Sequence, residues 1–317
     1  MTSRIAWAFL WLATTGVCLS ELKPGPMRTI RVPFWIQTAH GEPAPLIGVR
    51  DLSVEVRGHK FKPDVLLAPK SDLFLLLGLD LTGDAATAED AKDALVKEIG
   101  KLQPRTYVSV FNCQDELRVV QEPTTVRERS IQAVQSVGVI GKPGLLNCIE
   151  RVESIGDAIL TRSAVRVGVL FISDADVQNY RQDLINPVIN SSDPNDISRR
   201  FPEHLVQDAM AALSRRMAPA LAPLDVVQIN YLTDRWNEAY YDGLRAAAEN
   251  TMGEAQFCAT RAAIPAAIEH SFARLIQQYS VRITVPAHEE SVAIELKSSA
   301  PGAEHLMYRS RFTFRQK

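Results

Sequence analysis

The stretch Leu73–Asp84 (LFLLLGLDLTGD) decides the fold of this 317-residue chain. Its first part is apolar without polar alternation, which is typical of a strand buried on both faces within a parallel sheet. The run ends at Asp80, and Thr82 and Asp84 follow at alternate positions. Open α/β sheets bind ligands beyond the carboxyl ends of their strands, where these residues are expected. Hard oxygen donors at this spacing suit Mg²⁺ or another divalent cation.

Strands and helices alternate after this run. Strands separated by helical crossovers predict an α/β fold, an open, doubly wound, mostly parallel sheet within three layers. The expected strands lie at residues 72–80, 107–111, 117–121 (as a hairpin partner), 165–173, 226–232 and 255–259. The expected helices lie at residues 87–101, 125–136, 145–162, 202–217 and 264–278.

Both ends of the chain have a different pattern, in which polar and apolar residues alternate between Gly- and Pro-containing turns. This pattern predicts antiparallel strands at residues 29–37, 52–57, 60–62, 279–285, 291–296 and 307–314. Neither set has enough strands to bury a core alone. We therefore expect an N-terminal β segment (21–68) and a C-terminal β segment (278–317) to form one small β-sandwich beside an α/β domain (69–277).

The first twenty residues are typical of a secretory signal peptide. Arg4 precedes a short apolar block, Ile5–Leu12, and small or polar residues follow up to Ser20. The block is shorter than a membrane span, and no other segment of the sequence qualifies as one. We expect cleavage after Ser20, with Gly16 as the alternative. The mature chain is then extracytoplasmic, either periplasmic or secreted, without an integral membrane segment.

Three cysteines remain after the signal peptide, namely Cys113, Cys148 and Cys258. An odd number in an oxidising compartment permits one disulfide and one free thiol. Cys113 should close the second strand and Cys148 should open a helix, so both lie toward one sheet edge. One expectation is a Cys113–Cys148 disulfide with Cys258 free, and the other is three reduced, buried cysteines.

The switch point of the sheet brings two acidic strand ends together. The strand ending at Asp80 and the strand ending at Ser173–Asp174 are expected to be neighbours. Asp80, Thr82, Asp84 and Asp174 should therefore line one crevice, whether or not a metal is present. Carboxylates that lie so close repel one another unless a cation, a proton or solvent intervenes.

These residues resemble the metal-ion-dependent adhesion site of a von Willebrand factor A (VWA) domain. The whole mature chain resembles the VWFA-related Acidobacterial domain family. The matching segments, in order, are HGEPAPLIGVRDLSVEVRGHKFK (His40–Lys62), LLLGLDLTGD, YVSVFN with ELRVVQ, GKPGLLNCI, VLFISDAD, QQYSVRITVP and YRSRFTF.

The resemblance implies a metal site built from a DxSxS motif, a threonine before the third helix and an aspartate after the fourth strand. Asp80 fills the first position, Thr82 keeps the hydroxyl of the first serine, and Asp84 replaces the second serine. Asp174 matches the final aspartate. The ligand-contacting residues beside this set are Ser173, Pro143 and Gly144.

This chain departs from the motif, because Pro143 or Gly144 stands at the threonine position and Asp84 adds a carboxylate. Losing a hydroxyl removes a ligand, and added negative charge reduces the pull of a cation on an acidic partner. The expected cofactor is therefore none, or a weakly bound Mg²⁺ or other divalent cation. The implied function is a non-enzymatic module that binds an unidentified protein through a degenerate adhesion site.

An enzymatic alternative uses the same aspartate. The loop after Asp80 also resembles the nucleophile loop of haloacid-dehalogenase-type phosphotransferases, in which Asp80 would attack phosphorus beside Mg²⁺. Thr82 then stands where a general acid is needed, and a hydroxyl protonates a leaving group poorly. The sequence contains no GxSxG, HExxH, GxGxxG or Walker motif. Its pI of about 6.3 gives no electrostatic case for nucleic-acid binding.

Overall fold

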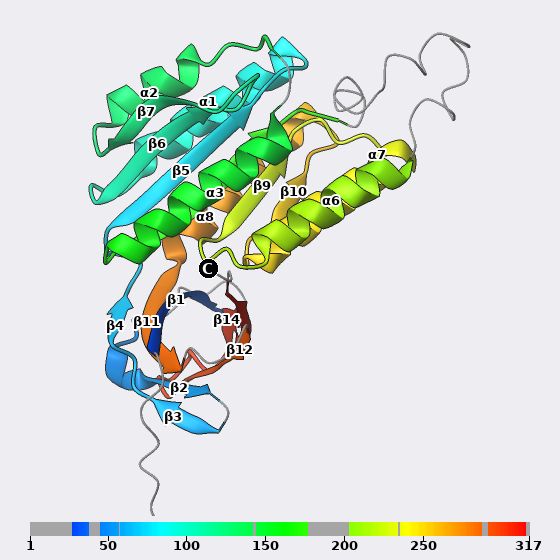
Figure 1. Cartoon of the computed structure of the whole chain (residues 1–317). Coiled ribbons are helices and arrows are strands. Elements are labelled where there is room, and N and C mark those ends of the chain that lie inside the picture. The colour runs from blue at the N-terminus through cyan, green and yellow to red at the C-terminus, as the bar shows by residue number, and fades with distance from the viewer. Residues whose placement is uncertain are drawn as a thin grey trace, which may run out of the picture.

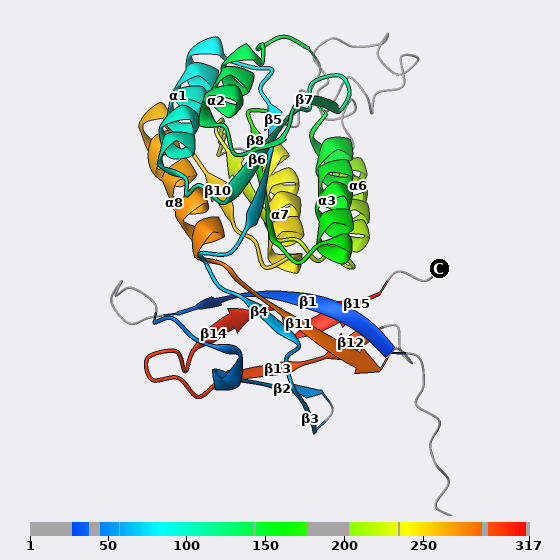
Figure 2. The same ribbon diagram turned by 90° about the vertical axis from the view of Figure 1, so that its left-hand side faces the viewer.

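The computed structural model describes residues 27–37, 45–56, 58–141, 144–176, 203–233, 235–286 and 291–314. The predicted signal peptide and Pro143 lie outside the described residues. The chain forms a larger α/β part and a smaller all-β part, which lie one above the other in Figures 1 and 2.

The α/β part is built on a six-stranded sheet with the order β10-β9-β8-β5-β6-β7. Its strands are β5 (Leu73–Asp80), β6 (Thr106–Asn112), β7 (Arg118–Thr124), β8 (Arg166–Ser173), β9 (Leu224–Gln228) and β10 (Ala255–Phe257). All neighbours pair in parallel except β6 and β7, which form the expected antiparallel pair. The predicted open, mostly parallel sheet is therefore confirmed, with β5 and β8 adjacent at its centre.

Helices cover both faces of this sheet, giving three layers (Figure 2). One face carries α1 (Ala85–Lys101), α2 (Arg127–Ser136) and α8 (Ile264–Gln277). The other carries α3 (Leu145–Arg162), α6 (Glu203–Met217) and α7 (Arg235–Asn250). Two short 3₁₀ turns, η2 (Val49–Asp51) and η4 (Arg261–Ala263), complete the described helical elements. Among the helices described, none combines the length and apolarity needed to cross a bilayer.

Helix α7 is absent from the elements that the sequence predicted. Its buried residues Leu244, Ala247 and Ala248 follow Tyr240 by four, seven and eight positions, which is the spacing of a single helix face. Asp242 and Arg245 are exposed on the other face, so the amphipathic pattern is present in the sequence although no helix was predicted from it. Without α7, the sequence also did not predict a role for the residues that this helix carries to the edge of the sheet.

The all-β part combines both ends of the described chain. Its strands are β1 (Met27–Ile36), β2 (Leu52–Val56), β3 (His59–Phe61), β4 (Val65–Leu67), β11 (Tyr279–Pro286), β12 (Ser291–Ala293), β13 (Glu295–Ser298), β14 (Leu306–Tyr308) and β15 (Arg311–Thr313). They form sheets of four (β14-β1-β11-β4), three (β13-β2-β3) and two strands (β12-β15) around one apolar core. Strand β1 pairs with β11 over eight residue pairs, from Met27↔Pro286 to Phe34↔Tyr279. The predicted sandwich of the two termini is confirmed.

The sequence placed two of the C-terminal strands too coarsely. The expected strand at 291–296 is divided between β12 and β13, which belong to different sheets. The expected strand at 307–314 is likewise divided between β14 and β15. Short strands that change sheets let a few residues close a small sandwich, and alternation alone does not reveal the break.

Arginine side chains join the two parts. Arg31 of β1 donates from Nε to Leu160 O and from Nη2 to Ser163 O, each at 2.8 Å. Arg309 donates from Nη1 to Ala220 O at 2.8 Å. These contacts lie at the amino end of the parallel strands, where β5 enters from the sandwich (Figure 2). The carboxyl edge of the sheet, which carries the predicted site, therefore faces away from the sandwich.

Candidate functional site

The candidate site lies where the two central strands end. Asp80 is the last residue of β5, and Ser173, its register partner, is the last residue of β8. The next residue, Asp174, donates its backbone N–H to Asp80 O at 3.2 Å. Both aspartates are buried, with exposed fractions of 0% and 2%. The predicted meeting of Asp80, Ser173 and Asp174 at one edge follows from this parallel register.

The carboxylate of Asp174 accepts hydrogen bonds from the loop that follows β5. Thr82 N donates to Oδ1 at 2.7 Å and Gly83 N donates to Oδ2 at 2.6 Å. Thr82 Oγ1 lies 3.4 Å from the same Oδ1. Burial raises the pKa of Asp174, while the hydrogen bonds from Thr82 and Gly83 act in the opposite direction. Both carboxylate oxygens are thus engaged by donors of this chain.

The carboxylate of Asp84 caps the helix that follows the loop. Asp84 is the N-cap of α1, and its Oδ2 accepts from both the backbone N and Oγ1 of Thr87, each at 2.7 Å. These hydrogen bonds lower the pKa of Asp84. Asp84 therefore caps α1, whose N-terminus has orphan N–H groups, and its place in the crevice with Asp80 and Asp174 stays a prediction.

Gly144 stands at the N-cap of α3 and donates its backbone N–H to Asp80 Oδ1 at 3.2 Å. A Cβ atom at this position would lie 2.1 Å from Cys113 O. No side chain fits in that space, so a threonine hydroxyl cannot be supplied from residue 144 with this backbone. The close approach explains why glycine stands here.

A disulfide borders the site. Cys113, directly after β6, is bonded to Cys148 in the first turn of α3, with 5.7 Å between their Cα atoms. Cys258 is the free cysteine of the described chain and is buried beyond β10. The structure thus confirms the disulfide expectation over that of three reduced cysteines. The bond ties the strand end that contacts Gly144 to the helix that Gly144 begins.

Gln114 also shapes the site, although no sequence pattern indicated it. Its buried side chain donates from Nε2 to Leu81 O and to Gly138 O, both at 2.5 Å. It thereby joins the loop after β5 to the loop after α2. A single amide between an aspartate and a cysteine gives no signal that would reveal this role. Ser173 Oγ accepts from Ala175 N at 3.0 Å, and its contact with a ligand stays a prediction.

The described residues contain no group of three or more His, Cys, Asp or Glu side chains arranged to hold a metal ion. Within the predicted set, Asp84 binds Thr87 and Asp174 binds two backbone N–H groups. Asp80 is also engaged, because Gly144 N–H donates to its Oδ1.

Comparisons with known proteins concern the fold of the chain. No family model matches the sequence, and no curated protein matches it. Among solved structures, a von Willebrand factor type A protein from Catenulispora acidiphila is similar at 11% identity and a TM-score of 0.46, over 93% of this chain and 75% of that one.

Two similar structures come from pilus proteins. The vWF domain of the type V pili tip protein Mfa5 from Porphyromonas gingivalis has 11% identity and a TM-score of 0.46, over 66% of this chain and 96% of that domain. The PilB minor pilin from Streptococcus sanguinis has 8% identity and a TM-score of 0.47, over 65% of this chain and 62% of that one. This chain thus spans less than two thirds of that pilin. With parallel strands in the order given above and an acidic loop after the central strand, the α/β part has a VWA-like fold.

Proposed function

We propose that this protein is a secreted or periplasmic, non-enzymatic protein-binding module whose adhesion site is degenerate. The observation that carries the proposal is the engagement of Asp174 by Thr82 N and Gly83 N at 2.7 and 2.6 Å. In such a site, backbone N–H groups supply the positive charge that a divalent cation would otherwise supply.

The donor set does not fit a resident divalent cation. A cation would have to compete with two backbone N–H groups for the oxygens of Asp174. At Asp80 it would meet the Gly144 N–H, whose positive end points at the same carboxylate. Mg²⁺ also requires nearly octahedral oxygen ligands, and Asp84 is committed to capping α1. We therefore expect Mg²⁺ to bind weakly or not at all.

An extracytoplasmic location has two supports. The first twenty residues have the charge and hydropathy pattern of a signal peptide. The Cys113–Cys148 disulfide is the second support, because disulfides persist mainly in oxidising compartments.

Exposed apolar side chains beside the site offer a surface for a protein partner. Ile140, with 86% of its surface exposed, precedes Gly141 in the loop that leads to Gly144. Val119 is 50% exposed on β7 and pairs with Phe111, one residue before the end of β6. Burying such side chains against an apolar partner would stabilise a complex without any metal ion.

No contact in the described structure favours the phosphotransferase alternative. Asp80 would have to reach a phosphorus atom, yet its side chain is buried and its Oδ1 accepts from Gly144 N. On our proposal, hydrolysis of an aryl phosphate in Mg²⁺ stays at background and does not change in Asp80→Asn.

The proposal is tested by capture of a partner from secreted or periplasmic extract on immobilised protein, with Mg²⁺ in one arm and EDTA in the other. We expect the wild type to retain the same protein in both arms and Ile140→Asp to lose it. Leu46→Asp, a matched change of an exposed apolar residue before β2, should retain it. The proposal would be contradicted if the wild type retained no protein, or if retention required Mg²⁺. It would also be contradicted if Ile140→Asp still retained the partner.

A further inference from the structure

A cluster of charged side chains lies at the joint where α8 runs into β11 and the two parts of the molecule meet (Figure 2). Its centre is Arg274, in the last turn of α8, whose side chain is only 9% exposed. Arg274 Nη1 lies 2.7 Å from Asp225 Oδ1 on β9, and Arg274 Nε lies 3.0 Å from Oε1 of Glu254, the residue before β10. The cluster is at the amino ends of the parallel strands, so it is separate from the candidate site at the opposite edge.

The same arginine contacts the sandwich. Its Cζ lies 4.0 Å from the centroid of the Trp35 ring in β1, and Trp35 Nε1 donates to Arg274 O at 2.8 Å. The tryptophan is buried, and its neighbour Phe34 pairs with Tyr279 at the start of β11. The guanidinium therefore lies between a carboxylate of the central sheet and an aromatic ring of the sandwich.

The carboxyl group of Asp225 is poorly suited to a permanent charge. Its side chain is completely buried. Its Oδ1 accepts from Arg274 Nη1 and from Glu254 N, whereas its Oδ2 has no hydrogen-bond partner in the described part of the chain. Burial raises the pKa of Asp225 to about 7, and Arg274 opposes this shift. The group therefore changes its charge near neutral pH.

Few charged or titratable groups face Asp225 among the described residues. Helix α8 contributes Arg274 and His270, and the segment before β10 contributes Glu254. The register partner of Asp225 on β8 is the apolar Leu170. His270 Nε2 lies 2.8 Å from Glu254 Oε2, and its side chain is 54% exposed. Asp225 is thus the buried titratable group that contacts the guanidinium, and His270 is the exposed one that a test must separate from it.

We infer that the charge state of Asp225 controls how firmly Arg274 holds Trp35, so that the contact between the two parts depends on pH near neutrality. With a proton on Asp225, the guanidinium faces one charged carboxylate fewer, and its attraction to the electron-rich ring of Trp35 is stronger. Loss of the proton creates a charge-assisted hydrogen bond to Asp225, which draws the guanidinium toward β9 and away from the ring.

Linkage gives the same direction. The unfolded carboxyl titrates near pH 4, so a pKa raised to about 7 means that the folded joint is most stable below about pH 4 and loses stability as the pH rises through 7. The contact is therefore firm in acid and loosens above neutrality.

Acrylamide quenching of tryptophan fluorescence tests the inference, because the quencher reaches Trp35 only when its ring is uncovered. The Trp35 contribution is the difference between each protein and its Trp35→Phe counterpart. In the wild type, its quenching constant should rise from about pH 5 to about pH 8, with a midpoint near 7. Asp225→Asn keeps an acceptor for Arg274 but cannot titrate, so its quenching constant should stay at the acid value throughout.

Two control variants should keep the rise seen in the wild type. Asp242→Asn removes an exposed carboxyl group from α7, and His270→Gln removes the other titratable group of the cluster. If Trp35→Phe does not fold, the indole N–H resonance of Trp35 in the wild type gives the midpoint instead.

Several results would overturn the inference. They are a quenching constant that is flat or falls with pH in the wild type, a rise that persists in Asp225→Asn, and a rise that is lost in His270→Gln or in Asp242→Asn.

Discussion

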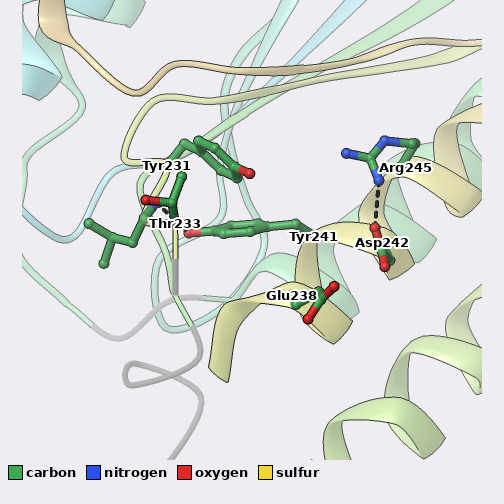
Figure 3. Close-up of a pocket in the computed structure, with 7 residues that line it drawn as sticks. Tyr231, Thr233, Glu238, Tyr241, Asp242 and Arg245 are labelled. Atoms are coloured by element: carbon green, nitrogen blue, oxygen red, sulfur yellow. Dashed lines mark hydrogen bonds and ion pairs between the residues drawn. The ribbon is translucent and has the colours of Figure 1, made fainter. Parts of the chain in front are cut away.

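The Asp80–Asp174 site and a recess between the loop after β9 and α7 lie at the same edge of one sheet and differ in what surrounds their carboxylates (Figure 3). At the first, buried carboxylates accept N–H groups from Thr82, Gly83 and Gly144 of the chain itself. At the second, the Glu238 carboxylate is exposed to solvent on α7. On our proposal, buried carboxylates whose oxygens already accept backbone N–H groups do not hold a cation.

The largest effect should come from placing the missing threonine in the first site. In Gly144→Thr, the new Cβ would lie 2.1 Å from Cys113 O, so the start of α3 must move away from β6. We expect a loss of about 4 kcal/mol or more in the free energy of unfolding, measured by urea denaturation. Gly138→Ala is the matched control, because a Cβ at Gly138 meets nothing within 4 Å. A stable Gly144→Thr protein that gains Mg²⁺ binding would contradict our account of the site.

Reduction of the disulfide should have the next largest effect. Cys113 and Cys148 close a loop with a sequence separation of 35 residues. The chain-entropy estimate for such a loop is about 4 kcal/mol of stability. We expect urea denaturation with and without reductant to show a loss of that order. Cys258→Ala should leave the effect of reductant unchanged, because Cys258 is the free cysteine of the described chain.

A pair of isosteric amide substitutions tests the comparison of the two sites directly. Asp174→Asn turns an NH₂ group toward Thr82 N or Gly83 N, so one buried donor loses its acceptor, at a cost of about 1–3 kcal/mol in unfolding free energy. Glu238→Gln, at the exposed rim, should change it by less than about 0.5 kcal/mol. Equal effects of the two substitutions would mean that the two sites do not differ as described.

The sequence predicted the positions of strands better than the uses of side chains. Adjacent ends for Asp80 and Asp174 follow from β5 and β8 being neighbours, because parallel strands end at a common edge. The capping role of Asp84 depends on how the first turn of α1 is oriented toward its carboxylate. The family motif indicated a role as a metal ligand. Such competition is decided by local geometry that residue spacing does not specify.

Close approaches between segments that are distant in the chain could not be predicted from the sequence either. The contact that excludes a side chain at Gly144 comes from the carbonyl of Cys113, which reaches it only after β6 and α3 have packed. The recess at Tyr231 depends on α7, which was not among the predicted helices although its buried residues have helical spacing. Both features are tertiary, because each joins residues that are not close neighbours in the sequence.

Asp225 sharpens the comparison, because this buried carboxylate of β9 does have a cationic partner. Arg274 Nη1 lies 2.7 Å from its Oδ1, and Glu254 N donates to the same oxygen at 3.0 Å. Burial nevertheless raises the pKa of Asp225 to about 7, although Arg274 opposes the shift. In the unfolded chain the carboxyl titrates near 4, at about its ordinary value. The stability of the protonated form is therefore fully present below about pH 4 and is lost as the pH rises through 7.

Asp225→Asn removes this titration. The unfolding free energy of the variant, relative to that of the wild type, should rise between pH 5 and pH 8, as measured by urea denaturation. Glu254, whose Oε1 lies 3.0 Å from Arg274 Nε, is present in both proteins, so its contribution largely cancels in the difference. A difference that stays constant or falls over this range would contradict the assignment.

The central claim is that backbone donors, and not a divalent cation, satisfy the carboxylates at the end of β5 and β8. Calorimetric titration of Mg²⁺ and Mn²⁺ into the metal-free protein tests it directly, with Asp80→Asn as the paired variant. We predict no saturable heat for the wild type at millimolar cation and no difference between the two proteins. One-to-one binding to the wild type that is lost in Asp80→Asn would contradict the account.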